Sequence, residues 1–285
     1  DVCSSDLSDV GGRVPGSEAG DNVSIYQEGL RVPPVRIYAA GKPCCDMLEL
    51  FHLNSRMPHY GEGDLMAQMA SCARGSARVQ ELFGKYGHDT MIARIDEMLD
   101  ATERRARNRI RDELKEGVYS AVDWLDEDGV SGERVKLTAT ITIKDGHLTI
   151  DLSECSPQIA SGKNVPLTHS YATAYFCLKS VVDPFLPTNE GLYRTVTIVA
   201  PEGLVVNPTP PAAVSSRNMT SMILAEAMLN ALGQAAPTRS VAAGGPGQGC
   251  ISAGADPVSG RFFIRSEEHS LNSSHVSESR MPSSA

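Results

Sequence analysis

The chain of 285 residues has few aromatic side chains, no long hydrophobic run and no paired cysteine spacing. No apolar stretch approaches the roughly 18–20 residues of a membrane-spanning helix, and no signal peptide is recognisable. The seven cysteines are an odd number and form no CxxC motif, which argues against a disulfide framework. We therefore expect a cytoplasmic protein with reduced thiols that does not bind membranes.

The composition is that of a globular protein, with 41% hydrophobic and 21% charged residues. The formal net charge is −9 at pH 7. Nucleic-acid-binding domains are usually basic, so this charge argues against a nucleic-acid partner.

Apolar residues at three- and four-residue steps predict helices in the first half of the chain, over 44–54, 63–83 and 89–116. A short strand is predicted over 35–40, followed by a turn at 41–43. The inward-facing residues expected on the two longer helices are Leu65, Met69, Cys72, Val79, Ile92, Ile95, Leu99, Ala106, Ile110 and Leu114.

From Gly117 onward the hydrophobic period changes to two. Strands are predicted over 118–125, 135–143 and 148–150, with a hairpin turn at Asp145-Gly146. Helices follow over 165–182 and 216–234, with a strand over 196–200 between them. The sequence predicts an α+β fold with an antiparallel ribbon, as one domain or as two lobes that meet near Gly117.

The segment over 8–34 has an irregular composition. Gly11, Gly12, Gly16 and Pro15 predict a tightly turned backbone, and the carboxylates Asp9 and Glu28 flank it. Rigid, irregular loops that carry acids often hold metals or substrates, but a surface turn between two strands explains these residues equally well.

Five blocks in order carry a family resemblance. The first pairs DVGGRVPGS (9–17) with YQEGLRVPPV (26–35), and the second pairs NSRMP (54–58) with GDLMAQ (63–68). The others are DLS (151–153) with NVP (164–166), PTNEG (187–191), and PEG (201–203) with PAAV (211–214). This order resembles the hydantoinase B/5-oxoprolinase family, which also includes the large subunit of acetone carboxylases.

The resemblance implies a B-type subunit of an ATP-dependent cyclic-amide hydrolase. An A-type partner, separate or fused, would bind ATP and activate 5-oxoproline or a hydantoin, and this subunit would hydrolyse the activated ring. A hetero-oligomer with a small-molecule lactam or hydantoin substrate is therefore expected. The alternatives are an acetone-carboxylase-type large subunit and a non-catalytic scaffold or inactive fragment.

The resemblance also implies a divalent metal ion, such as Zn, Mn or Fe, with Asp9 as one ligand. The family carries histidines just before the DVGG motif, where this chain has Asp6 and Leu7. We therefore expect the metal site in the intact parent protein rather than in this chain.

Three further residues are candidates for catalysis. Glu28 is a ligand, a general base or an orienting group, or it only fixes the following turn. Arg56 clamps a carboxylate or phosphate, or it forms a salt bridge, with Asp64 as one possible partner. Asp64 shares a helix face with Gln68, a substrate-binding candidate, but N-capping alone would also explain it.

Asn164, His169 and Asn189 are candidates for substrate binding. The two asparagines lie in loops bounded by proline, where they can bind amide or carboxylate groups or simply form turns. His169 follows the first of these loops, and a structural or surface role is the default explanation for such a lone histidine.

Both ends of the chain lack the hydrophobic periodicity of a helix or a strand. Residues 1–7 and the serine-rich residues 266–285 resemble translated adapter sequence, so the family domain is expected over 8–265. Because family members are about twice as long, we expect an internal fragment that is inactive by itself.

Overall fold

The computed structural model describes residues 7, 9–242, 244, 249–260 and 262–268, and these residues group into two compact units. Unit 1 is formed by Asp1–Ala19, Tyr26–Gln68 and Gly245–Ala285 as far as they are described, and unit 2 by Gly20–Ile25 and Met69–Gly244. The division falls inside a helix, and the boundary predicted near Gly117 lies within unit 2.

Unit 2 is built on a four-stranded sheet in the order β3-β4-β5-β6. The first three strands form an antiparallel meander, whereas β6 pairs with β5 in parallel, a direction that the sequence did not predict. A parallel neighbour needs a crossover connection, and α4 and α5 provide it. The strands are β3 (Gly117–Leu125), β4 (Val135–Lys144), β5 (His147–Asp151) and β6 (Val196–Val199).

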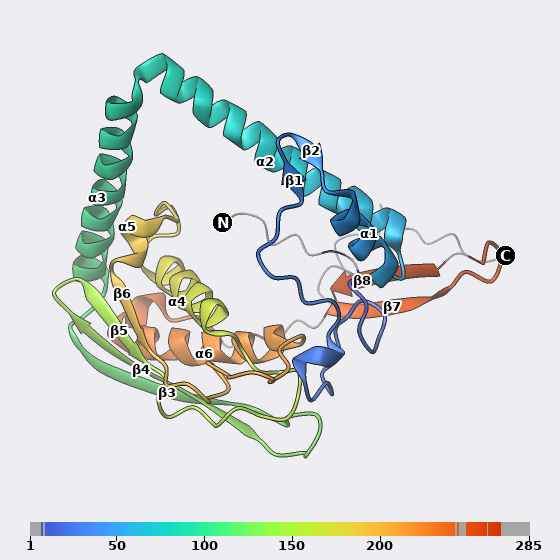
Figure 1. Cartoon of the computed structure of the whole chain (residues 1–285). Helices are drawn as coiled ribbons and strands as arrows, with labels where there is room; N and C mark the ends of the chain where they lie inside the picture. Colours follow the sequence, from blue (N-terminus) through green and yellow to red (C-terminus); the bar gives the residue numbers. More distant parts are fainter. Residues whose placement is uncertain (1–6, 8, 243, 245–248, 261, 269–285) are drawn as a thin grey trace. The chain divides into compact units, whose positions relative to one another are not determined.

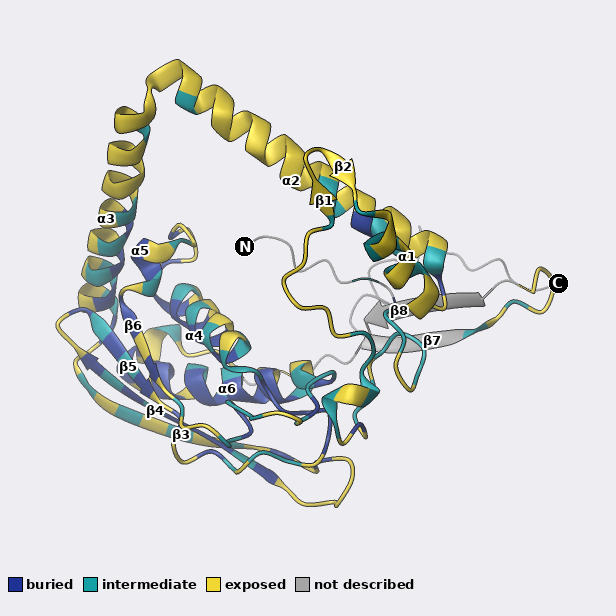
Figure 2. Cartoon of the chain, viewed as in Figure 1, coloured by how far each residue is buried: buried dark blue, intermediate teal, exposed yellow. Residues whose placement is uncertain are grey.

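The core of unit 2 lies between the sheet and its helices. Helix α6 packs against β3 and β4, and α4 packs against α6 (Figure 1). Figure 2 shows that buried residues are concentrated in these elements, among them Leu178 of α4 and Leu224 of α6. The remaining elements of this part are α4 (Leu167–Val182), α5 (Glu190–Tyr193), α6 (Arg217–Ala235) and η2 (Pro237–Arg239).

The predicted hairpin turn between β4 and β5 is confirmed. Asp145 and Gly146 both have positive φ, at 53° and 71°, as a two-residue turn matched to the twist of antiparallel strands requires. The alternating pattern of β4 is confirmed as well, because Leu137, Ile141 and Ile143 are buried in the core.

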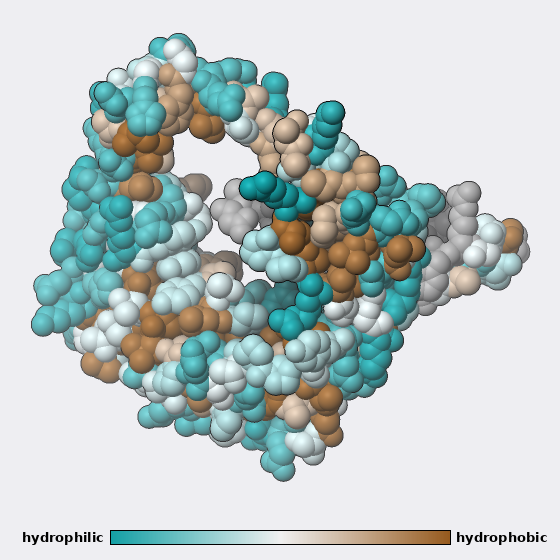
Figure 3. All heavy atoms as spheres, in the orientation of Figure 1, coloured by the Kyte–Doolittle hydropathy of each residue, from teal (hydrophilic) through white to brown (hydrophobic). Residues whose placement is uncertain are grey.

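Two long helices, α2 (Pro58–Tyr86) and α3 (His88–Glu113), meet at Gly87. Only part of the predicted apolar face of each helix is buried, since Val79, Ile92 and Ile95 are 51%, 41% and 38% exposed. On α3, burial begins in the second half, where Ala106 and Ile110 are fully covered; α3 contacts α5 and α4. Figure 3 shows hydrophobic side chains on the inner side of the angle between the two helices.

The first unit contains short elements. Helix α1 was predicted almost to its bounds, but the strand expected over 35–40 has only two residues, paired with two from the expected turn. Ser266–Glu268 belongs to β8, whereas the rest of the predicted adapter-like tail, and residues 1–6, lie outside the described residues. The elements are η1 (Ile25–Gln27), which starts at the border of unit 2, β1 (Tyr38–Ala39), β2 (Lys42–Pro43), α1 (Cys45–Asn54), β7 (Gly249–Ala255) and β8 (Phe262–Glu268).

The predicted α+β class is confirmed, since helices combine with a mixed sheet and two-stranded antiparallel sheets. Among the described residues, no helix is both long and apolar enough to cross a membrane.

Candidate functional site

The glycine-rich loop of unit 1 runs alongside the YQEGL segment. The Arg13 N–H donates to the Gln27 carbonyl at 2.9 Å, and the Leu30 N–H donates to the Val10 carbonyl at 2.8 Å. Between these bonds, Gly12 has φ +82°, and a Cβ on it would lie 2.7 Å from the Gln27 carbonyl oxygen. The first two sequence blocks therefore form one backbone unit that requires glycine at this position.

Asp9 is the polar centre of this unit. Its side chain is fully buried and accepts four hydrogen bonds: from the backbone N–H groups of Gly11, Gly16 and Arg56, each at 3.0 Å, and from the Arg56 guanidinium at 2.9 Å. Burial by itself raises the pKa of Asp9, but these bonds together outweigh it, so its pKa lies below the ordinary value. Asp9 is therefore an ionised carboxylate with its oxygens fully engaged.

Arg56 completes this arrangement, which we call the Asp9–Arg56 knot. Its guanidinium also donates to the backbone carbonyls of Gly11 and Val14, both at 3.2 Å, and of Gly12 at 2.5 Å. The salt-bridge alternative is the one observed, but its partner is Asp9 rather than Asp64. Arg56 therefore ties the loop to the segment that joins α1 and α2.

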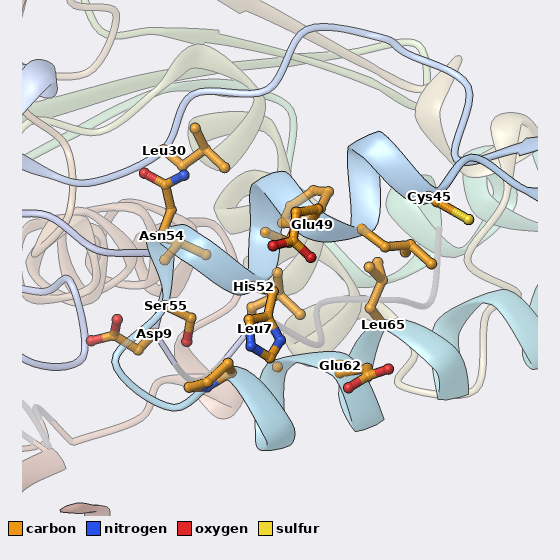
Figure 4. Close-up of a pocket in the computed structure, with 15 residues that line it drawn as sticks. Leu7, Asp9, Leu30, Cys45, Glu49, His52, Asn54, Ser55, Glu62 and Leu65 are labelled. Carbon is orange, nitrogen blue, oxygen red and sulfur yellow. The ribbon is translucent and has the colours of Figure 1, made fainter.

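A pocket with a cavity volume of about 240 Å³ lies beside the knot. It is lined by the loop, by one face of α1 and by the first turns of α2 (Figure 4). Figure 4 shows Glu49 and His52 of α1 on one side and Glu62 and Leu65 of α2 on the other. Leucine and phenylalanine side chains, including those of Leu30, Leu48 and Phe51, form much of its wall.

Of the predicted residues, only Asp9 is among the described residues that line this pocket. Glu28 lies in the segment beside Gly12 and is half-buried. Asp64 and Gln68 lie on α2, one turn apart. Because Pro58 starts this helix well before Asp64, the N-capping alternative for Asp64 is wrong.

Glu49, His52 and Glu62 were not predicted from the sequence as site candidates. The available signal was the three-residue step from Glu49 to His52, which places both on one helix face. What the sequence could not show is that α2 brings Glu62 to the same pocket.

The two asparagine candidates lie in unit 2, and both hydrogen-bond to backbone groups. The Asn164 amide is fully buried; its Nδ2 donates to three carbonyl oxygens, including that of Ala213 at 3.0 Å, and its Oδ1 accepts from the Ile159 N–H. Asn189 caps α5 by accepting from the Gly191 N–H at 3.0 Å. These contacts match the turn-forming alternative, and they leave the Asn164 amide no hydrogen for a ligand.

His169 lies in the first turn of α4. Its Nε2 is 3.2 Å from the Ser221 hydroxyl oxygen. Burial first, and then the positive charge of Arg217, lowers the pKa of His169, so the neutral imidazole is favoured. The structure thus gives His169 a side-chain partner inside unit 2, while its predicted role in substrate binding stays a prediction.

The sequence model of the hydantoinase B/oxoprolinase family matches residues 2–269. The chain belongs to the hydantoinase B/oxoprolinase family. It is 36% identical over 258 residues to the caprolactamase subunit beta of Pseudomonas jessenii, an alignment that covers 90% of this chain and 44% of the relative. The chain therefore spans less than half the length of this relative.

Two solved structures share the fold. The crystal structure of the ATP-dependent caprolactamase from P. jessenii matches with a TM-score of 0.84 at 35% identity, over 90% of this chain and 44% of that chain. A nucleotide-free acetone carboxylase structure matches with a TM-score of 0.83 at 17% identity, over 91% and 37%. The second match shows the fold alone.

The residues described in this family member do not fit a metal site. No group of three or more histidine, cysteine, aspartate or glutamate side chains is placed to hold a metal within the described part of the chain. Asp9, the expected ligand, already accepts four hydrogen bonds from the protein. Metal ligation by Asp9 would require at least one of these bonds to be exchanged.

Proposed function

We propose that this chain is part of the B-type subunit of an ATP-dependent cyclic-amide hydrolase. The observation that carries the proposal is the joint match in sequence and in fold to a caprolactamase subunit. Sequence identity to the acetone carboxylase is too low to favour a carboxylase. 5-Oxoproline, hydantoins and lactams are all candidate substrates under this proposal.

The pocket beside the Asp9–Arg56 knot supports the proposal because its size and lining suit a small ring. A volume of about 240 Å³ accommodates a five- to seven-membered cyclic amide, with Leu48 and Phe51 against its methylene groups. The His52 imidazole and the Ser55 hydroxyl, which also line the pocket, can hydrogen-bond the ring amide. The knot keeps the loop wall rigid.

Ring opening at neutral pH needs activation, since amides hydrolyse slowly. We assign that activation to an A-type partner, separate or fused, that binds ATP and forms a hetero-oligomer with this subunit. For the intact protein we also propose a divalent metal such as Zn, Mn or Fe, but the described residues do not fit it, and ligation by Asp9 would first require a hydrogen bond of the knot to be exchanged. Glu28 is our candidate to orient or deprotonate the attacking water, although it is not among the described residues that line the pocket. We expect the 285-residue chain alone to be inactive and the intact protein to be cytoplasmic.

The test is an ATP-dependent ring-opening assay on the longer gene product with its A-type partner. We expect ADP release coupled to hydrolysis of at least one of ε-caprolactam, hydantoin and 5-oxoproline. The Arg56→Ala variant should lose ring opening because the loop beside the pocket loosens, whereas exchange of Asp46, which lies on α1 outside the pocket lining, should leave it intact. ATP-independent turnover, or no turnover of any ring, would refute the proposal.

A further inference from the structure

We propose that the unit 1 pocket selects cyclic amides by charge, taking neutral or amine-bearing rings and rejecting rings that carry a carboxylate. This inference rests on the proposed function and narrows its substrate class. It assigns the selectivity to Glu49 and Glu62, two residues outside the recognisable sequence blocks.

The pocket wall contains several acidic side chains. Glu49 and Glu62 approach it from facing helices, and Asp9 adds a third carboxylate at the loop (Figure 4). Among the described residues that line the pocket there is no lysine and no arginine. The wall therefore carries negative charge without a lining cation.

The negative charge of Asp9 is neutralised by the protein, whereas the charges of Glu49 and Glu62 are not neutralised by any described residue. The Asp9 charge is compensated by Arg56 at 2.9 Å and by three backbone N–H donors. No described residue forms an ion pair with Glu49 or Glu62. Arg56 cannot serve them, because its guanidinium is taken up by Asp9 and three carbonyl oxygens.

The charges of Glu49 and Glu62 have opposite effects on acidic and basic rings. A ring carboxylate in this pocket would face two negative charges that no described side chain neutralises, and it would gain no cationic partner from the pocket wall. A ring ammonium would gain one or two such partners, and the apolar wall would contact the methylene groups in either case. Because both glutamates are solvent-exposed, each should change affinity by only about two- to fivefold.

The experiment measures binding to the 285-residue chain by calorimetry at low ionic strength, where surface charges are least screened. The probes share one five-membered ring: 3-aminopyrrolidin-2-one, pyrrolidin-2-one and 5-oxoproline. We expect affinity to fall in that order. In E49Q and E62Q the ratio of the affinities for the first and last probes should shrink about two- to fivefold per variant. In the double variant the two affinities should be equal.

The matched control is Asp46→Asn, which removes one negative charge from the same helix but not from the pocket wall. It should leave the order and spacing of the three affinities unchanged, and circular dichroism should show that all variants are folded. Equal binding of the three probes, preference for 5-oxoproline, or no binding of any probe would overturn the inference. Because these readouts need neither ATP nor a partner, they are independent of the turnover assay for the proposed function.

Discussion

The two units of this protein are stabilised in different ways. In unit 2, a mixed sheet and two helices bury a large set of aliphatic side chains, with Leu224, Met228 and Ile141 fully covered. In the described part of unit 1, the buried hydrophobic residues are Met57 and Leu65, and the loop is held by the Asp9–Arg56 knot and by close backbone contacts at glycine.

The difference shows which part of this fold is stabilised by hydrophobic packing and which part by specific hydrogen bonds and an ion pair. Aliphatic packing tolerates exchange of one hydrophobic residue for another of similar volume. A buried carboxylate with four specific donors tolerates almost no exchange, because any lost donor leaves charge unsatisfied. The family-like DVGG and NSRMP blocks thus coincide with the part of the molecule that depends on exact residue types.

The largest expected effect tests the packed unit. Leu224→Ala should lower the free energy of unfolding of unit 2 by about 3 kcal/mol, because it leaves a cavity in a fully buried site. The single tryptophan, Trp124, lies on β3, so its fluorescence reports on this unit during denaturant unfolding. Leu53→Ala, at a side chain that is 73% exposed, is the control and should change stability by less than about 0.5 kcal/mol.

A second prediction concerns the loop of unit 1. Gly12→Ala should open residues 9–30 locally at a cost of about 2 kcal/mol, because the added Cβ would clash with the Gln27 carbonyl and the positive φ is unfavourable. Hydrogen exchange of peptides over this range should accelerate while the Trp124 transition stays unchanged. Gly75→Ala, on α2 with nothing within 4 Å of the added Cβ, should instead stabilise by up to about 1 kcal/mol. A shifted Trp124 transition in G12A would show that the two units unfold together.

The third prediction is a pH dependence confined to the knot. Since the folded pKa of Asp9 lies below its unfolded value, its contribution to stability is complete above the unfolded pKa and is lost as pH falls through the folded pKa. Amide protection of Gly11 and Gly16, corrected for intrinsic exchange, should therefore decrease below about pH 4. In D9N this pH dependence should be absent; if it persists, another group controls the loop.

The smallest expected effect is one of reactivity. Burial raises the pKa of Cys155 to about 11 and that of Cys177 to about 12, so both thiols should resist alkylation at pH 8 in the folded protein. Cys45 and Cys72 are exposed and should react readily. Mass spectrometry after a short alkylation pulse distinguishes the two pairs, and rapid labelling of Cys177 would contradict the close packing of α4 against α6.

Much of the fold could be predicted from local periods, which depend only on the residues of each element. The same periods could not show which apolar helix faces pack against another element. Ile92 and Ile110 fit one helical pattern, yet only Ile110 is buried. The parallel pairing of β6 also escaped prediction, because strand direction depends on a crossover rather than on alternation. Family resemblance located Asp9 and Arg56, but not the contact between them.

For the predicted binding residues, the sequence was least informative about which groups hydrogen-bond their side chains. Asn164 in a proline-bounded loop has the same local signature whether its amide faces a ligand or the backbone, and only the tertiary structure shows three carbonyl acceptors around it.

The parallel strand β6 has a consequence for how the sheet is assembled. The strands β3, β4 and β5 are neighbours in sequence as well as in space, so they can pair through contacts that are local in sequence. β6 can join β5 only after the chain between Asp151 and Val196 has crossed the sheet as a helix, which makes its docking a non-local and slower event. We therefore expect the edge of β5 that faces β6 to be the last edge within this sheet to be paired as the chain folds.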